Sequence, residues 1–132
     1  MQCLRWPAGP RHPSGHGDAM AISVGNTHLQ TSKIAKINFN KIIEIQNVTK
    51  IPLVLHGSSG ISNQMRKNIA SKTNVAKFNI GTELRMVAGN SLRNNINNNT
   101  KIFDRLQLLK PTIIDIKNKT KKIIKNISAS ND

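Results

Sequence analysis

The chain of 132 residues has one cysteine, one tryptophan, three phenylalanines, no tyrosine and only six acidic residues. Its single cysteine, Cys3, excludes an internal disulfide framework and a zinc site built from cysteines. Aromatic residues make up 3% of the chain, so few side chains could stack on nucleic-acid bases. The longest apolar runs, such as residues 51–55, are too short to cross a bilayer, and no secretory signal opens the chain. We therefore expect one domain at most, in the cytoplasm and not in a membrane.

The scarcity of acidic residues leaves a formal net charge of +14, because Lys and Arg number 20. One interpretation is a nucleic-acid-binding protein, since a basic domain attracts phosphate backbones. The other interpretation is compositional, because Asn and Ile are enriched together with Lys in segments such as residues 94–99 and 117–122. A nucleic-acid site has no physical need for additional Asn and Ile. We favour the compositional interpretation and do not expect a nucleic-acid partner.

The first 17 residues differ in composition from the rest of the chain. Residues 1–17 contain Trp6 and three prolines but no Ile, Lys or Asn. Proline and glycine at this density oppose both helices and strands. We therefore predict an atypical, disordered head at residues 1–17, a folded domain at residues 18–128 and a short tail at residues 129–132.

Within residues 18–128, short β-favouring segments alternate with segments of helical spacing. Strands are predicted at residues 18–24, 52–55 and 75–80. Helices are predicted at residues 39–48, 62–71, 83–92 and 112–127. Ser62 is predicted to be the N-cap of the second helix, and an Asn-rich loop is predicted before the last one. This alternation with short links predicts βαβ units, a parallel sheet and an α/β fold. A closed (β/α)8 barrel needs eight strands, so the chain corresponds to part of a larger domain.

Each predicted strand is followed by a polar segment. The three segments are Gly25-Asn26-Thr27-His28, His56-Gly57-Ser58-Ser59-Gly60 and Asn79-Ile80-Gly81-Thr82. The carboxyl ends of parallel strands share one edge of a sheet, and neutral imidazoles bind zinc well, so a polar site is one interpretation. The alternatives are surface histidines, tight glycine turns and helix caps. The residues alone leave both interpretations open.

In this order, three segments resemble the C-terminal part of class II, zinc-dependent ketose-bisphosphate aldolases, the family of fructose- and tagatose-1,6-bisphosphate aldolases. The segments are residues 18–28 (DAMAISVGNTH), 51–61 (IPLVLHGSSGI) and 75–85 (VAKFNIGTELR). Residues 36–39 and 103–105 are also similar to the family, and the resemblance extends over residues 14–128.

The resemblance implies a fold, a reaction and a set of site residues. The fold would be the C-terminal three β/α units of a (β/α)8 TIM barrel, a partial barrel. The reaction would be the zinc-assisted, reversible cleavage of fructose- or tagatose-1,6-bisphosphate in glycolysis and related carbohydrate metabolism. Its products are dihydroxyacetone phosphate and glyceraldehyde 3-phosphate. By resemblance, His28 and His56 would be two of three Zn²⁺ ligands, and the dihydroxyacetone phosphate half of the substrate would contact Gly57, Ser59, Asn79 and Thr82.

The chain departs from the family pattern at two points. It contains no Asp-His pair, so the family's catalytic aspartate and first zinc histidine are absent, and Leu29 stands where the family has glycine. We therefore expect the isolated chain to be inactive unless a homo-oligomer or a separate N-terminal barrel half completes the site. The alternatives are a non-enzymatic remnant of an aldolase and a basic nucleic-acid-binding protein.

Overall fold

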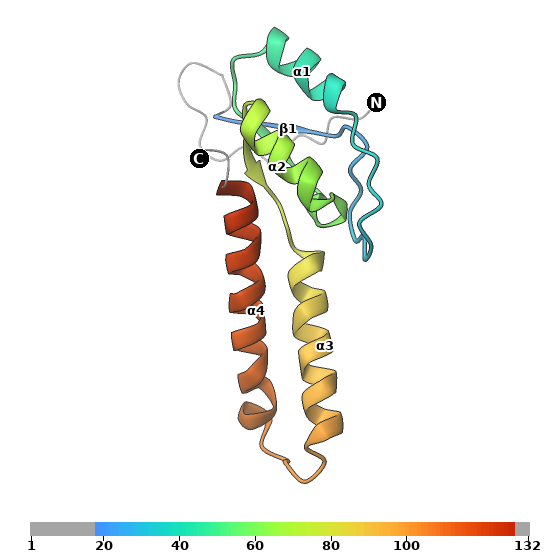
Figure 1. Ribbon diagram of the computed structural model, residues 1–132, viewed down its shortest axis with the longest axis vertical. Coiled ribbons are helices and arrows are strands. Elements are labelled where there is room, and N and C mark those ends of the chain that lie inside the picture. The colour runs from blue at the N-terminus through green and yellow to red at the C-terminus, as the bar shows by residue number, and fades with distance from the viewer. Residues whose placement is uncertain (1–17, 129–132) are drawn as a thin grey trace.

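The computed structural model describes residues 18–128 (Figure 1). In chain order its elements are β1 (Met20–Ile22), α1 (Phe39–Val48), β2 (Leu53–Leu55), the short 3-10 turn η1 (Ser58–Gly60), α2 (Asn63–Lys72), β3 (Val75–Phe78), α3 (Thr82–Asn98) and α4 (Arg105–Ser128). The predicted head at residues 1–17 and tail at residues 129–132 lie outside the described residues. No helix in the described range has both the length and the apolar character of a membrane span.

The three strands form one parallel sheet in the order β1-β2-β3, which confirms the predicted α/β fold. Met20 pairs with Leu53, and Leu53 pairs with Val75. The register between β2 and β3 then shifts, so that Val54 pairs with Lys77. Parallel neighbours need a crossover connection, and the segments containing α1 and α2 provide the two crossovers. All three strands therefore end at the same edge of the sheet.

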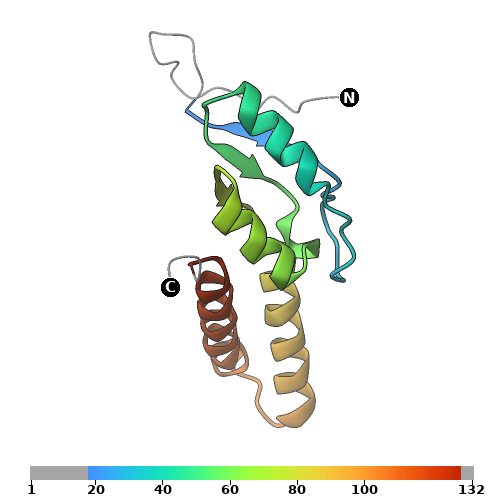
Figure 2. The same cartoon turned by 45° about the horizontal axis from the view of Figure 1, so that its top comes forward.

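The hydrophobic core lies between the sheet and the first two helices. Leu53 and Leu55 of β2 are fully buried, as expected for alternate residues that share one face of a strand. Ile42 of α1, Ile69 of α2 and Ile61 between β2 and α2 are fully buried in the same cluster. Figure 2 shows α1 and α2 beside the strands, whereas α3 and α4 extend beyond the sheet. This core fixes β1 against β2, and therefore fixes the segments that follow them.

Side-chain caps set the starts of α1 and α2. Helix α1 spans the predicted residues 39–48, and Oδ1 of Asn38 accepts a hydrogen bond from the Lys41 N–H at 3.0 Å. The predicted N-cap Ser62 is confirmed, because its Oγ accepts a hydrogen bond from the Met65 N–H at 3.2 Å. These hydrogen bonds satisfy N–H groups that have no partner inside the helix.

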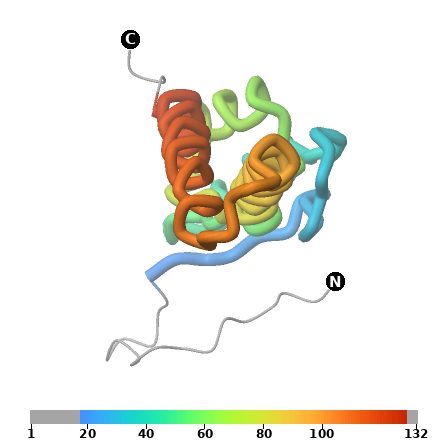
Figure 3. The backbone as a smooth tube through the Cα atoms, turned by 90° about the horizontal axis from the view of Figure 1, so that it is seen from below, coloured from blue at the N-terminus to red at the C-terminus, as the bar shows by residue number. Residues whose placement is uncertain are grey.

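Helices α3 and α4 run antiparallel and form an arm (Figures 1 and 3). The prediction of an Asn-rich loop after residue 92 is wrong, because α3 continues as far as Asn98. The predicted start of the last helix at Thr112 is also wrong, because α4 begins at Arg105 and passes through Pro111.

A contact between the two helices explains how α4 accommodates Pro111. Proline has no N–H, so the carbonyl of Gln107, four residues earlier, lacks a donor within the helix. The side chain of Asn95 on α3 supplies one, because its Nδ2 lies 2.7 Å from the Leu108 carbonyl oxygen and 3.4 Å from that of Gln107. The asparagine-rich end of α3 is therefore part of the interface within the arm.

Replacing Asn95 by alanine tests this contact. We expect the free energy of unfolding of Asn95→Ala to be about 1 kcal/mol below that of a matched control, because the carbonyls beside Pro111 lose their donor. Asn97→Ala is the control, since Asn97 is exposed on the same helix and the substitution changes helix propensity equally. Urea unfolding followed by far-ultraviolet circular dichroism measures both variants. Equal stabilities would contradict the role given to Asn95.

Candidate functional site

A cavity of about 360 Å³ lies at the edge where the three strands end. Five of the six predicted site residues line it, namely His28, Gly57, Ser59, Asn79 and Thr82. The structure therefore brings together residues that are up to 54 positions apart in the sequence. We call this space the strand-end cavity.

The sixth predicted residue, His56, lies beside the strand-end cavity. Its ring centroid is 5.7 Å from that of His28, and the two ring planes are tilted by 55°. Nδ2 of Asn79 lies 3.2 Å from Nδ1 of His56 and 3.4 Å from Nε2. The two histidines and Asn79 thus form one group of neighbouring polar side chains.

The spacing of the two imidazoles suits a shared metal ion. Two imidazoles bound to one tetrahedral zinc, with Zn–N bonds of about 2 Å, have ring centroids about 5 Å apart. The observed separation of 5.7 Å is close to that value. Within residues 18–128, however, no group of three or more His, Cys, Asp or Glu side chains gathers at one point. The described residues therefore bring two imidazoles together but gather no set of three candidate ligands.

Asn26, which the sequence analysis did not single out, fixes the ends of β1 and β2 to each other. Its side chain is buried and accepts a hydrogen bond from the Val24 N–H at 2.7 Å. Its Nδ2 donates to the carbonyl oxygen of His56 at 2.6 Å and approaches that of Ile22 at 3.4 Å. The sequence signal for this role was the position of Asn26 directly after a predicted strand and a glycine. This residue sets where the loop carrying His28 lies relative to His56.

Gly57 permits the close approach of two loops beside the strand-end cavity. Its φ is +60°, and a Cβ atom at this position would lie 2.3 Å from the Thr27 carbonyl oxygen. The turn that follows directs the two serine hydroxyls differently. Oγ of Ser58 donates to the Leu55 carbonyl oxygen at 2.9 Å, whereas Oγ of Ser59 accepts from the Glu83 N–H at 3.1 Å. Ser59 therefore joins this turn to the first turn of α3.

The N-terminus of α3 adds positive potential to the strand-end cavity. The N-cap residue Gly81 has no side chain, and Ser59 provides the capping oxygen from another segment. Arg85 also lines the cavity, and its Nη2 lies 3.3 Å from Oγ1 of Thr82. A helix N-terminus with a nearby guanidinium favours anions, phosphate in particular. Arg85 was not predicted as a site residue. The available signal was its position four residues after Gly81, which places it in the first turn of the helix.

Behind the strand-end cavity, one buried carboxylate pairs with three cations. The side chain of Glu83 contacts Lys33 Nζ at 2.6 Å, Arg66 Nη2 at 2.8 Å and Lys119 Nζ at 2.7 Å. Burial by itself raises the pKa of Glu83, but hydrogen bonds from Lys119, Lys33 and Arg66 outweigh it and lower that pKa to about 2. We call these four residues the Glu83 cluster. It joins α2, α3, α4 and the loop after β1.

Leu29 has a left-handed backbone conformation with a φ of +60°, and 74% of it is exposed. This conformation costs a residue with a Cβ atom about 1–2 kcal/mol. We expect Leu29→Gly to raise the free energy of unfolding by about 0.5–1 kcal/mol, after the entropic cost of glycine is deducted. Leu29→Ala is the control, because it removes the exposed side chain and keeps the Cβ atom. Urea unfolding compares the three proteins, and an equal gain in Leu29→Ala would argue against backbone strain.

The low pKa of Glu83 predicts how stability depends on pH. A folded-state pKa of about 2, against an ordinary value of 4.5, contributes stability that is complete above the ordinary value and is lost as the pH falls towards 2. We expect this contribution to be about 3 kcal/mol. The wild-type protein should therefore lose more stability between pH 5 and pH 2 than Glu83→Gln does. Urea unfolding across this range measures the loss, with Glu44→Gln at an exposed ion pair as the control. Identical pH profiles for the two glutamine variants would refute the prediction.

Comparison with known proteins identifies relatives of the chain by sequence and by fold. The family model for class-II fructose-bisphosphate aldolase matches residues 14–132. The fructose-bisphosphate aldolases of Staphylococcus aureus strains Mu50 and COL are each 34% identical to the chain over 115 residues. The match covers 86% of this chain and 40% of each relative. Among solved structures, the crystal structure of the YdjI aldolase from Escherichia coli matches with a TM-score of 0.70 and 29% sequence identity. It covers 86% of this chain and 39% of that one.

The chain thus spans about two fifths of the length of the relatives that it matches. The matched segment contains the three strand-end segments on which the resemblance to aldolases rested, and that resemblance is confirmed. By sequence and by fold, the chain belongs to the class II fructose-bisphosphate aldolase family.

Proposed function

We propose that the chain forms the side of an aldolase site that binds dihydroxyacetone phosphate, and that it contributes two of the zinc ligands. The substrates would be ketose 1,6-bisphosphates, fructose or tagatose, cleaved reversibly to dihydroxyacetone phosphate and glyceraldehyde 3-phosphate. The observation that carries this proposal is the convergence of His28 with Gly57, Ser59, Asn79 and Thr82 around one cavity. The single cysteine is compatible with a cytoplasmic enzyme, because it supports no disulfide framework.

The phosphate group would bind at the start of α3. The Glu83 N–H of this helix binds Ser59 and the Leu84 N–H binds the Gly81 carbonyl oxygen, so the Thr82 N–H and the helix dipole would attract the anion. Arg85 would add a guanidinium, which matches phosphate oxygens with two parallel hydrogen bonds. The hydroxyl of Ser59 accepts a hydrogen bond from the Glu83 N–H, and its own proton is still available for a phosphate oxygen. Gly57 would act indirectly, because its lack of a Cβ lets the loop with Thr27 and His28 lie against the turn that carries Ser59.

The carbonyl end of the substrate would lie near the two histidines. His28 and His56 would hold the zinc ion, and Asn79 would fix the orientation of the His56 ring, which it contacts at 3.2 Å. A bound zinc ion supplies a Lewis acid for the ketose carbonyl oxygen. Asn79 and Thr82 would orient the substrate from the neighbouring strand end. These residues bind and position the substrate, and none of them is a carboxylic acid.

Cleavage of the carbon–carbon bond also needs an acid that handles the proton on the aldehyde oxygen. The sequence has no Asp-His pair of the family type. We therefore assign the acid and the third zinc ligand to a complementary barrel segment or to a second copy of the chain. The sheet has room for such strands, because within the described residues β1 and β3 each pair on one side only. Unpaired edges of this kind readily accept further strands.

Titration of the purified chain with zinc tests the role of the two histidines. We expect His28→Ala and His56→Ala each to weaken zinc binding by about tenfold or more, because each removes one of two ligands. His16→Ala is the control, since it removes a histidine from residues 1–17. Isothermal titration calorimetry measures the affinities. Unchanged zinc affinity in both variants would count against a shared metal site.

Cleavage assays with both bisphosphates then separate binding from catalysis. We expect the isolated chain to bind dihydroxyacetone phosphate and to show no turnover. Turnover that disappears in His56→Ala would mean that self-association supplies the missing groups. Failure to bind dihydroxyacetone phosphate would overturn the proposal and favour a non-enzymatic remnant.

A further inference from the structure

Glu83 is connected to Ser59 by two routes. Its backbone N–H donates to Oγ of Ser59 at 3.1 Å. Its carboxylate binds Nζ of Lys33 at 2.6 Å, and the same Nζ donates to the Ser59 carbonyl oxygen at 2.8 Å. The hydroxyl and the carbonyl of Ser59 are therefore both held by Glu83, one directly and the other through Lys33.

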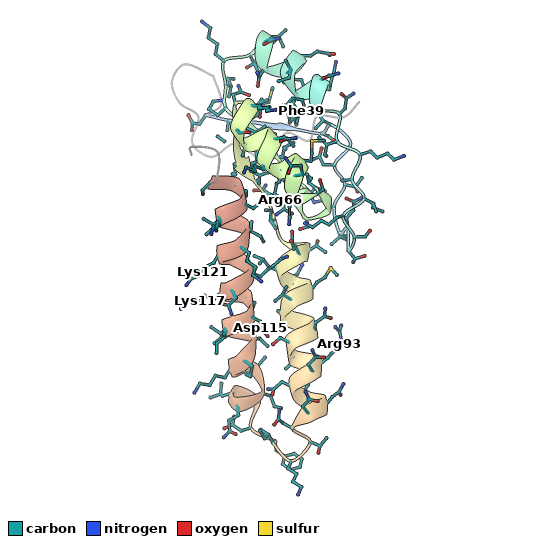
Figure 4. All side chains as sticks on the ribbon, in the orientation of Figure 1. Phe39, Arg66, Arg93, Asp115, Lys117 and Lys121 are labelled. Atoms are coloured by element: carbon teal, nitrogen blue, oxygen red, sulfur yellow. The ribbon has the colours of Figure 1, made fainter. Side chains whose placement is uncertain are left out.

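The buried Arg66 on α2 needs a negative charge beside it, and the Glu83 carboxylate provides that charge. Arg66 is fully buried, and Figure 4 labels it where α2 meets the arm. Its Nη2 binds Glu83 and the Ile61 carbonyl oxygen, whereas Nε and Nη1 have no hydrogen-bond partner in the described part of the chain. A buried guanidinium is tolerated only with a compensating charge. Glu83 supplies that charge, which restricts where its own carboxylate can lie.

Lys119 connects the arm to the same point. Its Nζ lies 2.7 Å from Oε1 of Glu83, although Lys119 belongs to α4 and does not line the strand-end cavity. It lines a separate cavity of about 240 Å³, as do Lys33 and Glu83. Because Lys119 binds Glu83 and Glu83 binds Ser59, a shift of α4 would also move Ser59.

We propose that Glu83 is a positioning residue, whose carboxylate holds Ser59 in place for a phosphate ligand through Lys33 and ties that position to α4 through Lys119. This inference rests on the proposed phosphate site. Two effects of removing the carboxylate have opposite signs. A purely electrostatic role predicts that the loss of a negative charge near an anion site strengthens phosphate binding. The positioning role predicts that the same loss weakens it, because Ser59 is no longer fixed.

The test is a titration of the full chain with inorganic phosphate and with dihydroxyacetone phosphate, by isothermal titration calorimetry at neutral pH. We expect Glu83→Gln to weaken binding by about fivefold or more, a coupling of ordinary size. Glu44→Gln is the matched control, because it removes the same charge from an exposed ion pair on α1. We expect the control to bind as the wild type does.

A second pair of variants applies should Glu83→Gln fail to fold. Lys119→Met and Lys121→Met remove the same charge from the same helix, and Lys121 lies on the exposed outer side of α4 (Figure 4). Only Lys119→Met should weaken phosphate binding. A merely structural role would lower the stability of Lys119→Met and leave the affinity of the folded fraction unchanged, so urea unfolding is measured in parallel.

The outcomes separate this inference from the proposed function. Wild-type binding, together with equal or tighter binding by folded Glu83→Gln, would overturn the positioning role and leave the phosphate site intact. Equal binding by Lys119→Met and Lys121→Met would overturn it in the same way. Absence of phosphate binding by the wild-type chain would overturn the proposed function, and this inference with it.

Discussion

The carboxylate of Glu83 is the point at which four separate segments of the chain meet. The sequence has only six acidic residues against 20 Lys and Arg, and Glu83 is among its buried polar residues. There it offsets the charges of Arg66, Lys33 and Lys119, which come from α2, the loop after β1 and α4. Its position in the first turn of α3 also suits the positive end of the helix dipole. The strand-end cavity depends on this junction, because Ser59 is held by the same residue.

Backbone geometry explains why the polar residues gather without a large core. Three parallel strands of three or four residues end at one edge, and the two crossovers that contain α1 and α2 return the chain to the opposite edge. The loops at the shared edge can lie close together because Gly57 has no Cβ and Asn26 joins the ends of β1 and β2. The α3 N-terminus then faces the same space. These contacts would give the proposed phosphate site its local basis, at the end of the sheet where (β/α)8 barrels tend to bind phosphate.

Much of this arrangement follows from the sequence, since it depends on local signals. Apolar runs followed by polar residues predicted the three strand ends, and a serine at helical spacing predicted the Ser62 cap. Parallel pairing predicts that His28, Gly57, Ser59, Asn79 and Thr82 come to one edge of the sheet, although their roles remain predictions. The sequence did not predict hydrogen-bond and ion-pair partners that are far apart in the chain. Asn95 contacts carbonyl oxygens near Pro111, and Arg66 pairs with Glu83, only after α3, α4 and α2 have packed. Tertiary contacts of this kind override local propensity.

The proposed site has two parts, a phosphate subsite and a metal subsite, which differ in how many of their groups the described residues supply. The proposed phosphate donors come from one turn, residues 57–59, and one helix start, residues 79–85, and the Glu83 cluster fixes both to the same core. If the proposed site is right, binding of a phosphate would need no further polypeptide. The proposed metal site differs, because two imidazoles leave the coordination of zinc unfinished, and the described residues gather no third ligand beside them. Under the proposed function, binding and chemistry would thus have different structural requirements, because only the chemistry would depend on groups from added strands.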